Sequence, residues 1–258
     1  MHTKLSAPVI GVIPARLAST RLPRKVLREI AGQPLLAWVY QAAANAGIFD
    51  RIIVAADSEE VAELCRAQRW EFQMTSSELA SGTDRVHAVA RQLAQEDKRR
   101  DADPIFVNIQ GDEPLLRREH FQALLKPFER AEVEVSTLRT RCPEEDIANP
   151  NVVKVVVDRD SRALYFSRAS IPWNRDSRGD VSYWKHLGMY AYRKHILDRF
   201  PNLTTSKLEA AERLEQLRLL ENGISIQVEP VEFDTVGVDT EADLKTVAAL
   251  FWKLHHVR

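Results

Sequence analysis

The first half of the chain alternates short runs rich in β-branched residues with amphipathic segments of helix length. This pattern is typical of parallel strands joined by crossover helices, and it predicts a doubly wound, mostly parallel α/β sheet. A serine at position 58 is placed to cap the second helix. The expected strands are 9–13, 51–56, 71–74 and 105–110, and the expected helices are 34–46, 59–69 and 83–95.

The second half changes character, because most of its β-rich runs follow one another without helix-length segments between them. This arrangement predicts antiparallel strands and a projecting hairpin. No linker-like stretch separates the halves. We therefore expect a single domain over residues 1–258 with an inserted antiparallel β subdomain at about 135–192. The expected strands are 135–141, 152–157, 163–167 and 186–192, followed by helix 209–221, strand 225–231 and helix 240–252.

The composition of the chain limits the kinds of partner and the location that we expect. The formal net charge of -1 over 258 residues gives no general attraction for nucleic acid or an anionic membrane. The two cysteines, Cys65 and Cys142, lack the spacing of a zinc site or a disulfide framework, so free thiols are expected. Neither a membrane-spanning run nor a signal peptide is indicated, and we expect a cytoplasmic protein.

The loop after the first expected strand concentrates positive charge. It runs over residues 13–25 and carries Arg16, Arg21, Arg24 and Lys25. Its two prolines and lack of glycine exclude both the GxGxxG and the GxxxxGK[ST] phosphate loops. Arginine and lysine side chains at the carboxyl end of a strand suit a polyanionic ligand such as a triphosphate. A solvated charged turn is the alternative interpretation.

Two carboxylates follow strand-like runs. Asp112 ends the segment NIQGD, where Gly111 is expected to leave room for a ligand, and Asp239 ends GVD. Magnesium takes one or two protein carboxylates together with phosphate and water oxygens, so this pair is a candidate Mg²⁺ site. Asp239 has an alternative role as the cap of the last helix, and Asp112 as a turn carboxylate.

Several motifs follow one another along about residues 9–250 of the chain. They are PARLASTRLPRK, SGTDR, NIQGDEP, NPNVVKVV, ALYFSRASIP, KHLGMYAY, KLEAAERLEQLR and GVDT. Together they resemble those of the 3-deoxy-manno-octulosonate cytidylyltransferases, also called CMP-Kdo synthetases. The resemblance implies a nucleotidyltransferase-like fold, a homodimer, CTP as cosubstrate, Mg²⁺ as cofactor, an acidic eight-carbon sugar as acceptor and a product used for lipopolysaccharide.

The resemblance assigns site residues motif by motif. Lys25, Asp112 and Asp239 would be catalytic, and the two aspartates would hold the metal. The β-rich insertion would bind sugar and form the dimer. The remaining CTP ligands would be Arg16, Arg21, Ser81, Gly82, Thr83 and Arg85, and the sugar ligands would be Gln110, Arg168, His186, Tyr190, Glu215 and Gln216.

One position departs from the family pattern, which reads RLPGK where this chain has Arg24 in place of the glycine. Its arginine either points to solvent or adds a phosphate contact, and a backbone conformation open to glycine is disfavoured there. We favour the orientation toward solvent, in which Arg24 has no effect on the binding of phosphate.

Structural roles compete with the assigned sugar contacts. Arg168 has an alternative role in pairing with a structural carboxylate, and His186 resembles a core histidine. Glu215 and Gln216 lie in an amphipathic segment that normally exposes such residues. Two other functions also stay open: activation of a different acidic sugar, such as a sialic acid or an amino analogue, and a non-catalytic nucleotide-binding module.

Overall fold

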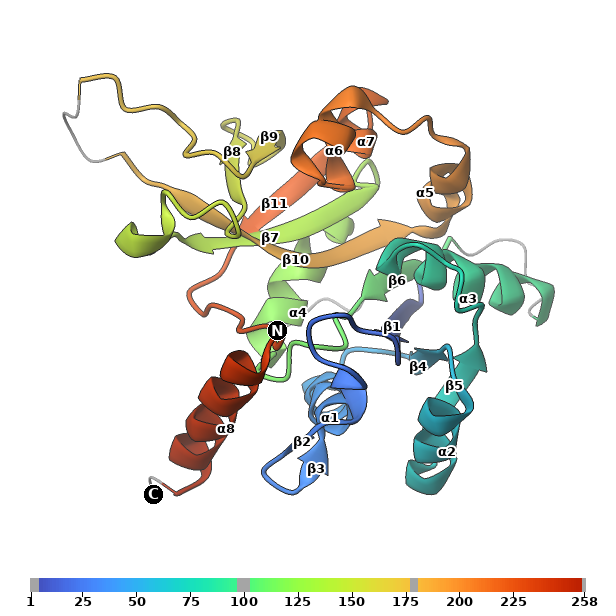
Figure 1. Cartoon of the computed structure of the whole chain (residues 1–258). Helices are drawn as coiled ribbons and strands as arrows, with labels where there is room; N and C mark the ends of the chain where they lie inside the picture. Colours follow the sequence, from blue (N-terminus) through green and yellow to red (C-terminus); the bar gives the residue numbers. More distant parts are fainter. Residues whose placement is uncertain (1–4, 97–102, 177–180, 257–258) are drawn as a thin grey trace. The chain divides into compact units, whose positions relative to one another are not determined.

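The computed structural model describes residues 5–96, 103–176 and 181–256 (Figure 1). The chain folds into two compact units. Unit one comprises Ser6–Arg118 and Thr235–Arg258, and unit two comprises Glu119–Asp234 together with Leu5. That the whole chain acts as one domain, with an insertion at about 135–192, stays a prediction.

Unit one contains the expected parallel sheet. Strand β1 (Val9–Ala15) pairs with β4 (Arg51–Ala56) on one side and with β6 (Ile105–Asn108) on the other, and β4 pairs with β5 (Glu71–Met74). Every one of these pairings is parallel, which confirms the α/β prediction. The buried residues of β1 and β6 are mainly valine, isoleucine and phenylalanine, as expected for strands covered on both faces.

The strand order β6-β1-β4-β5 determines where the helices lie. The chain moves outward from β1 through α1 (Leu35–Ala46) and α2 (Glu59–Gln68), then returns through α3 (Gly82–Glu96) to β6. Because such crossovers are right-handed, the reversal places α3 on the opposite face from α1 and α2, as Figure 1 shows. The gap between the carboxyl ends of β1 and β6 is therefore a topological switch point, where α/β sheets bind ligands.

Local signals explain the ends of these helices. Ser58 accepts a hydrogen bond from the Val61 N–H and caps α2, as predicted. Gly47 ends α1 with a φ of 63°, a left-handed conformation that glycine adopts without strain.

The last helix of unit one, α8 (Glu241–His256), packs on the region that contains α1. Leu244, Val247 and Phe251 of α8 join Leu22 and Leu35 in one buried apolar cluster. Each buried leucine, valine or phenylalanine of this kind contributes about 2 kcal/mol to stability. The cluster therefore fixes the final segment of the chain against the loop that follows β1.

Unit two contains the predicted antiparallel pairings. Strand β7 (Val135–Arg141) pairs antiparallel with β10 (Trp184–Arg193) and parallel with β11 (Ile226–Pro230). A hairpin of β8 (Lys154–Val157) and β9 (Ala163–Ser167) meets β10 at Lys185. Further helices of unit two are α4 (Arg118–Leu125), which begins at the last residue of unit one, α5 (Lys194–Arg199), α6 (Lys207–Glu212) and α7 (Gln216–Glu221).

The prediction of one helix over 209–221 was wrong. A capping box at Ser206 starts α6 earlier, and Arg213 adopts a left-handed conformation with a φ of 53° that ends it. The chain resumes helical structure at Gln216 as α7. Helices α4 and α5 were not predicted. Nor were the hairpin of β2 (Glu29–Ile30) with β3 (Gln33–Pro34) and the 3-10 turns Lys25–Leu27, Lys126–Glu129, Glu144–Asp146 and Phe200–Asn202.

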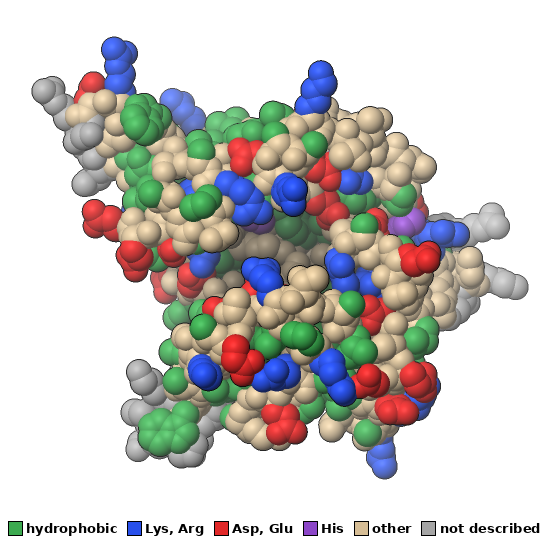
Figure 2. Space-filling model, in the orientation of Figure 1, with side chains coloured by type: hydrophobic (Ala, Val, Ile, Leu, Met, Phe, Trp, Pro, Cys, Tyr) green, Lys and Arg blue, Asp and Glu red, His purple; other side chains and the backbone are tan. Residues whose placement is uncertain are grey.

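Both cysteines are free thiols, as expected, with Cys65 buried and Cys142 half-buried. Burial raises the pKa of the Cys65 thiol to about 11, so it is protonated and unreactive at neutral pH. Figure 2 shows acidic and basic side chains interspersed over the visible face, in keeping with the small net charge. No helix within the described ranges is long and apolar enough to cross a membrane.

Candidate functional site

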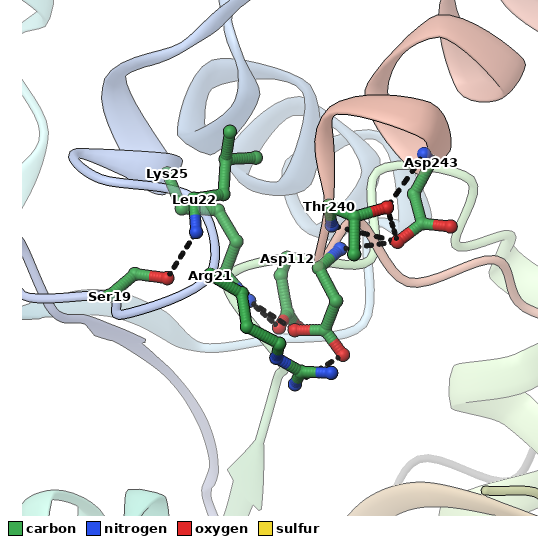
Figure 3. A network of polar contacts seen from close by, with 8 residues as sticks. Ser19, Arg21, Leu22, Lys25, Asp112, Thr240 and Asp243 are labelled. Carbon is green, nitrogen blue, oxygen red and sulfur yellow. Dashed lines mark hydrogen bonds and ion pairs between the residues drawn. The ribbon is translucent and has the colours of Figure 1, made fainter.

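The basic loop and both predicted metal-binding carboxylates meet at the switch point of unit one (Figure 3). The Lys25 ammonium donates to Asp112 Oδ2 at 2.5 Å and to Asp239 Oδ1 at 2.9 Å. The Arg21 guanidinium forms an ion pair with Asp239 Oδ2 at 2.9 Å. Residues separated by 87 and 214 positions in sequence are thereby brought to one lysine.

Asp239 is available for this cluster because it does not cap α8. Thr240 takes that role: its Oγ1 accepts from the Asp243 N–H at 3.2 Å. Asp243 Oδ2 in turn accepts from the backbone N–H groups of Asp239 and Thr240 at 3.0 and 2.8 Å. These reciprocal bonds fix the backbone at the start of α8 and leave the Asp239 carboxylate directed at Lys25 and Arg21.

Lys25 stays fully charged in this setting. Burial by itself lowers the pKa of the Lys25 ammonium, but the charge and hydrogen bond of Asp112, followed by those of Asp239, raise it above its ordinary value. Because the lysine side chain is only 14% exposed, its charge is poorly screened by water. The Lys25 ammonium is therefore a fixed cation at the end of the basic loop, which is the candidate binding site for phosphate.

The donor set of this cluster suits magnesium. Asp112 and Asp239 offer hard carboxylate oxygens beside each other, since both reach the same ammonium group. The described residues contain no group of three or more His, Cys, Asp or Glu placed to hold a metal. A pair of carboxylates is the protein contribution that Mg²⁺ usually takes, with water and phosphate oxygens completing its shell.

Gly111 lies against the backbone of the loop after β1. A Cβ at this position would lie 2.5 Å from the carbonyl oxygen of Pro14, which is closer than any real contact. The glycine therefore leaves room for the backbone of the loop after β1, and that it also leaves room for a ligand stays a prediction. It lets that loop lie directly against the segment carrying Asp112.

The segment SGTDR forms the start of α3. Asp84 Oδ2 accepts from the backbone N–H and hydroxyl of Ser81, both at 3.0 Å, while Ser81 Oγ accepts from the Asp84 N–H at 3.1 Å. Gly82 and Thr83 are the first residues of the helix. Arg16 Nη2 donates to the Ala80 carbonyl at 2.8 Å, which joins the basic loop to this segment.

Arg85 supports this part of the site from inside. Its side chain is completely buried and donates to Thr75 Oγ1 at 2.8 Å and to the Ser76 carbonyl at 3.0 Å. It also pairs with Asp57 at 3.2 Å. These contacts hold α3 against the segment after β5, and a direct contact of Arg85 with CTP stays a prediction.

Asp57 is a structural residue of the site that the sequence analysis missed. Its Oδ1 accepts from the Leu17 N–H of the basic loop at 2.9 Å, while its Oδ2 pairs with Arg85. One carboxylate thus links the loop after β1 to α3. The signal was present in the sequence, because Asp57 directly follows the strand β4, as Asp112 follows the end of β6.

Arg24 adopts the conformation that the family's glycine would favour, with φ 56° and ψ 31°. Its guanidinium forms an ion pair with Glu60 of α2. The side chain is 62% exposed, which agrees with the solvent-facing orientation favoured from the sequence, and the ion pair with Glu60 lies at the surface.

We expect Arg24→Gly to change CTP affinity by less than about threefold, because the guanidinium is engaged with Glu60. Glycine relieves the strain of the left-handed conformation, which stabilises the fold. The variant also loses an exposed ion pair and gives the unfolded chain more freedom, and both changes destabilise the fold. The net change in the free energy of unfolding is expected to stay within about 1 kcal/mol. CTP titration by calorimetry and urea unfolding measure both quantities. Arg21→Ala is the matched control and is expected to weaken CTP binding. A tenfold loss in Arg24→Gly would make Arg24 a phosphate ligand.

The predicted sugar ligands fall into two groups. Gln110 follows β6 in unit one, while the others lie in unit two. His186 of β10 is 9% exposed and its Nε2 lies 3.0 Å from Thr137 Oγ1. Burial lowers the pKa of His186 to about 3, so the imidazole is neutral at physiological pH. These contacts match the interpretation as a core histidine, and its contact with sugar stays a prediction.

Tyr190 lies beside His186, with ring centroids 5.5 Å apart. Burial raises the pKa of its hydroxyl well above the ordinary value, so it is a neutral donor. Gln216 is buried as the first residue of α7, contrary to the exposure expected from the amphipathic pattern, and Glu215 precedes it as the N-cap.

Arg168 follows β9 and is held mainly by backbone groups. Its Nε donates to the Glu212 carbonyl at 2.8 Å and its Nη1 to the Pro150 carbonyl at 3.0 Å. The structural carboxylate considered from the sequence is present, but it binds the Arg168 backbone: Glu212 Oε2 accepts from the Arg168 N–H at 2.9 Å.

Comparisons with known proteins agree on one family. Residues 10–226 match the family described as Cytidylyltransferase. The 3-deoxy-manno-octulosonate cytidylyltransferase of Acidobacterium capsulatum is 57% identical over 245 residues, which cover 95% of this chain and 97% of the relative. The enzyme of the same name from Koribacter versatilis is 55% identical over 238 residues, covering 92% of this chain and 88% of the relative.

Solved structures show the same likeness. The structure of CMP:2-keto-3-deoxy-manno-octonic acid synthetase complexed with CTP has a TM-score of 0.88 and 38% sequence identity, and the match covers 96% of this chain and 100% of that one. A 4-diphosphocytidyl-2C-methyl-D-erythritol synthase from Anaerococcus prevotii has a TM-score of 0.61 at 10% identity, covering 95% and 98% of the two chains, and shows the shared fold alone.

Proposed function

The chain belongs to the 3-deoxy-manno-octulosonate cytidylyltransferase family, and on this premise we propose that it transfers CMP from CTP to the anomeric hydroxyl of 3-deoxy-manno-octulosonate, releasing pyrophosphate. The observation that carries the proposal within this chain is the meeting of Lys25, Asp112 and Asp239 at the switch point. The sheet offers that position to a ligand, and the cluster supplies the charges that a nucleotide triphosphate needs.

The reaction brings two anions together, because the acceptor carbon of the sugar also carries a carboxylate. The anomeric oxygen attacks the α-phosphorus of CTP, a new O–P bond forms, and the bond to the bridging oxygen of pyrophosphate breaks in line, while the hydroxyl proton passes to water. Arg16, Arg21 and Lys25 would orient the triphosphate and offset the charge that grows on the leaving group. Lys25 has three N–H donors and uses two of them on Asp112 and Asp239, and among the described residues nothing accepts the third, which can donate to a phosphate oxygen.

We propose that Asp112 and Asp239 hold Mg²⁺ in the working enzyme. The bound ion would neutralise phosphate charge and lower the pKa of the attacking hydroxyl. The support comes from the paired carboxylates beside the basic loop, which match the oxygen donors that magnesium takes. Lys25 bridges both carboxylates and would remain their counter-ion at the edge of such a site.

Metal chelation is expected to reduce pyrophosphate release by at least about 100-fold, since charge neutralisation at the phosphates would be lost. The measurement is pyrophosphate release from CTP and 3-deoxy-manno-octulosonate with excess EDTA. Added Mg²⁺ in excess over EDTA should restore the rate, which controls for damage by the chelator. Equal turnover with and without free metal would remove magnesium from the proposal.

The identity of the sugar is tested by a panel of acidic acceptors. We expect the largest kcat/KM for 3-deoxy-manno-octulosonate, because the similar relatives carry that name over nearly their whole length. A larger kcat/KM for a sialic acid or for the amino analogue of the octulosonate would replace this substrate. CTP binding without pyrophosphate release from any acceptor would make the chain a nucleotide-binding module.

The family also supports the remaining parts of the proposal. We propose that the enzyme works as a cytoplasmic homodimer and supplies activated sugar for lipopolysaccharide. Light scattering on the purified chain measures its mass against the 29.4 kDa of one copy. A single-copy mass at micromolar concentration would contradict the dimer.

A further inference from the structure

Glu212, the last residue of α6, contacts Arg168 and its neighbour in three ways that the reaction described above does not use. Its Oε2 accepts from the Arg168 backbone N–H at 2.9 Å, and its backbone carbonyl accepts from Arg168 Nε at 2.8 Å. Its Oε1 accepts from Ser167 Oγ at 2.6 Å. One glutamate therefore fixes the backbone at the end of β9 and one edge of the Arg168 guanidinium.

A buried lysine holds the backbone carbonyl of the same arginine. Lys154 is fully buried, and its ammonium donates to the carbonyls of Arg168 at 2.8 Å, Asn149 at 2.8 Å and Val152 at 2.6 Å. The turn that these bonds hold also carries the Pro150 carbonyl, which accepts from Arg168 Nη1. The N–H, the carbonyl and the guanidinium of Arg168 are thus all held by neighbouring residues.

The Arg168 guanidinium has N–H donors that no described residue uses. Nε and one N–H of Nη1 are occupied by backbone carbonyls, and Nη2 makes no hydrogen bond to a residue within the described ranges. Because guanidinium is planar, fixing Nε and Nη1 also fixes the direction of Nη2. The free edge of the guanidinium, formed by the two N–H groups of Nη2, can donate to the oxygens of a carboxylate.

We propose that Glu212 is a positioning residue, which holds Arg168 so that its free edge receives the carboxylate of the acceptor sugar. This inference rests on the proposed function, since it assigns the sugar carboxylate to Arg168. The carboxylate of Glu212 does not face the substrate itself, because both of its oxygens accept from Ser167 and Arg168. Losing it releases the end of β9 and lets the arginine leave its orientation.

The first test is the kinetics of Glu212→Ala. We expect the KM for the sugar to rise about tenfold while the KM for CTP changes less than about twofold, because the variant removes no contact in the basic loop. Glu221→Gln is the matched control: Glu221 is an exposed glutamate of α7 whose Oε2 accepts from the Leu208 N–H at 3.3 Å, and it should leave both KM values unchanged. Where Glu212→Ala fails to fold, Glu212→Gln, which keeps one acceptor oxygen, takes its place.

The second test separates positioning from general damage by a double-mutant cycle with Arg168→Ala. If Glu212 acts through Arg168, the double variant should have nearly the sugar KM of Arg168→Ala alone, so the two effects are strongly non-additive. The carboxamide analogue of the sugar should bind wild type and Glu212→Ala with inhibition constants within about twofold of each other, because it lacks the charged group.

Three outcomes would overturn the inference: additive effects in the cycle, equal losses for CTP and sugar, or the same loss for the acid and its carboxamide. These differ from failure of the proposed function, which would show as absence of pyrophosphate release by the wild type with 3-deoxy-manno-octulosonate. In that case the same cycle, run with whichever acidic sugar is turned over, still decides whether Glu212 acts through Arg168.

Discussion

Replacing Asp112 by asparagine is expected to lower kcat for pyrophosphate release by at least about 100-fold, and Asp239→Asn should have an effect of the same size. Asparagine keeps the shape of the side chain but loses the charge that would hold Mg²⁺ beside the triphosphate. The fold should survive, because the Asp112 and Asp239 side chains are 27% and 44% exposed and each pairing with Lys25 contributes only about 1 kcal/mol.

The controls separate lost metal from lost structure. Asp160→Asn, at an exposed turn of unit two, should keep full activity and stability. Mn²⁺ binding in the presence of CTP, followed by electron paramagnetic resonance, should weaken in Asp112→Asn and Asp239→Asn at unchanged urea midpoints. Near-normal kcat of both variants at limiting Mg²⁺ would remove the metal assignment.

The parallel half of the fold was predictable because each element carries its own local signal. Both ends of strands β4 and β5 were predicted correctly, and Ser58 indicated where α2 begins. Arg213 shows where such signals end: nothing in the apolar periodicity of 209–221 indicates a left-handed residue in its middle. The break follows from tertiary contacts, since Glu212 at the end of α6 is held by Ser167 and Arg168.

The candidate site was predictable in its residue types but not in its contacts. The basic loop and the two acidic strand ends indicated a place for a charged ligand. Their meeting at Lys25 depends on strand order and on α8, which connect positions far apart in the chain. The sequence also could not show which of two neighbouring residues caps α8. Thr240 is the cap, so the Asp239 carboxylate is available to Lys25.

Supporting residues escaped the sequence analysis for a related reason. Asp57 and Glu212 act by holding Leu17, Arg85 and Arg168, so their importance lies in partners that only the folded chain brings near them. Gly111 was recognised as a close-contact position, but the neighbour that requires it is the Pro14 carbonyl. Sequence motifs identify such positions without revealing whether a ligand or the protein itself fills the space.

His186 should make stability fall as the solution becomes acidic. Burial lowers the pKa of the folded imidazole to about 3, whereas the unfolded value is about 6.5. Between these two pH values the unfolded chain therefore binds a proton at His186, whereas the folded protein does not. The contribution is fully present above about pH 6.5 and is lost progressively as the pH falls toward about 3, because protonation then favours the unfolded state.

Between about pH 8 and about pH 5, this linkage is expected to lower the unfolding free energy of the wild type by about 2 kcal/mol relative to His186→Gln. Glutamine does not titrate, and it can still hydrogen-bond Thr137, which lies 3.0 Å from the imidazole Nε2. Urea unfolding of both proteins at each pH gives the comparison, and the difference between them cancels the titration of other groups, including the buried His120. His195→Gln, at an exposed histidine paired with Glu134, is the control and should not reproduce the effect. Parallel pH profiles for wild type and His186→Gln would mean that the imidazole is protonated or hydrated in the folded protein, and the assignment of a neutral, buried His186 would then be wrong.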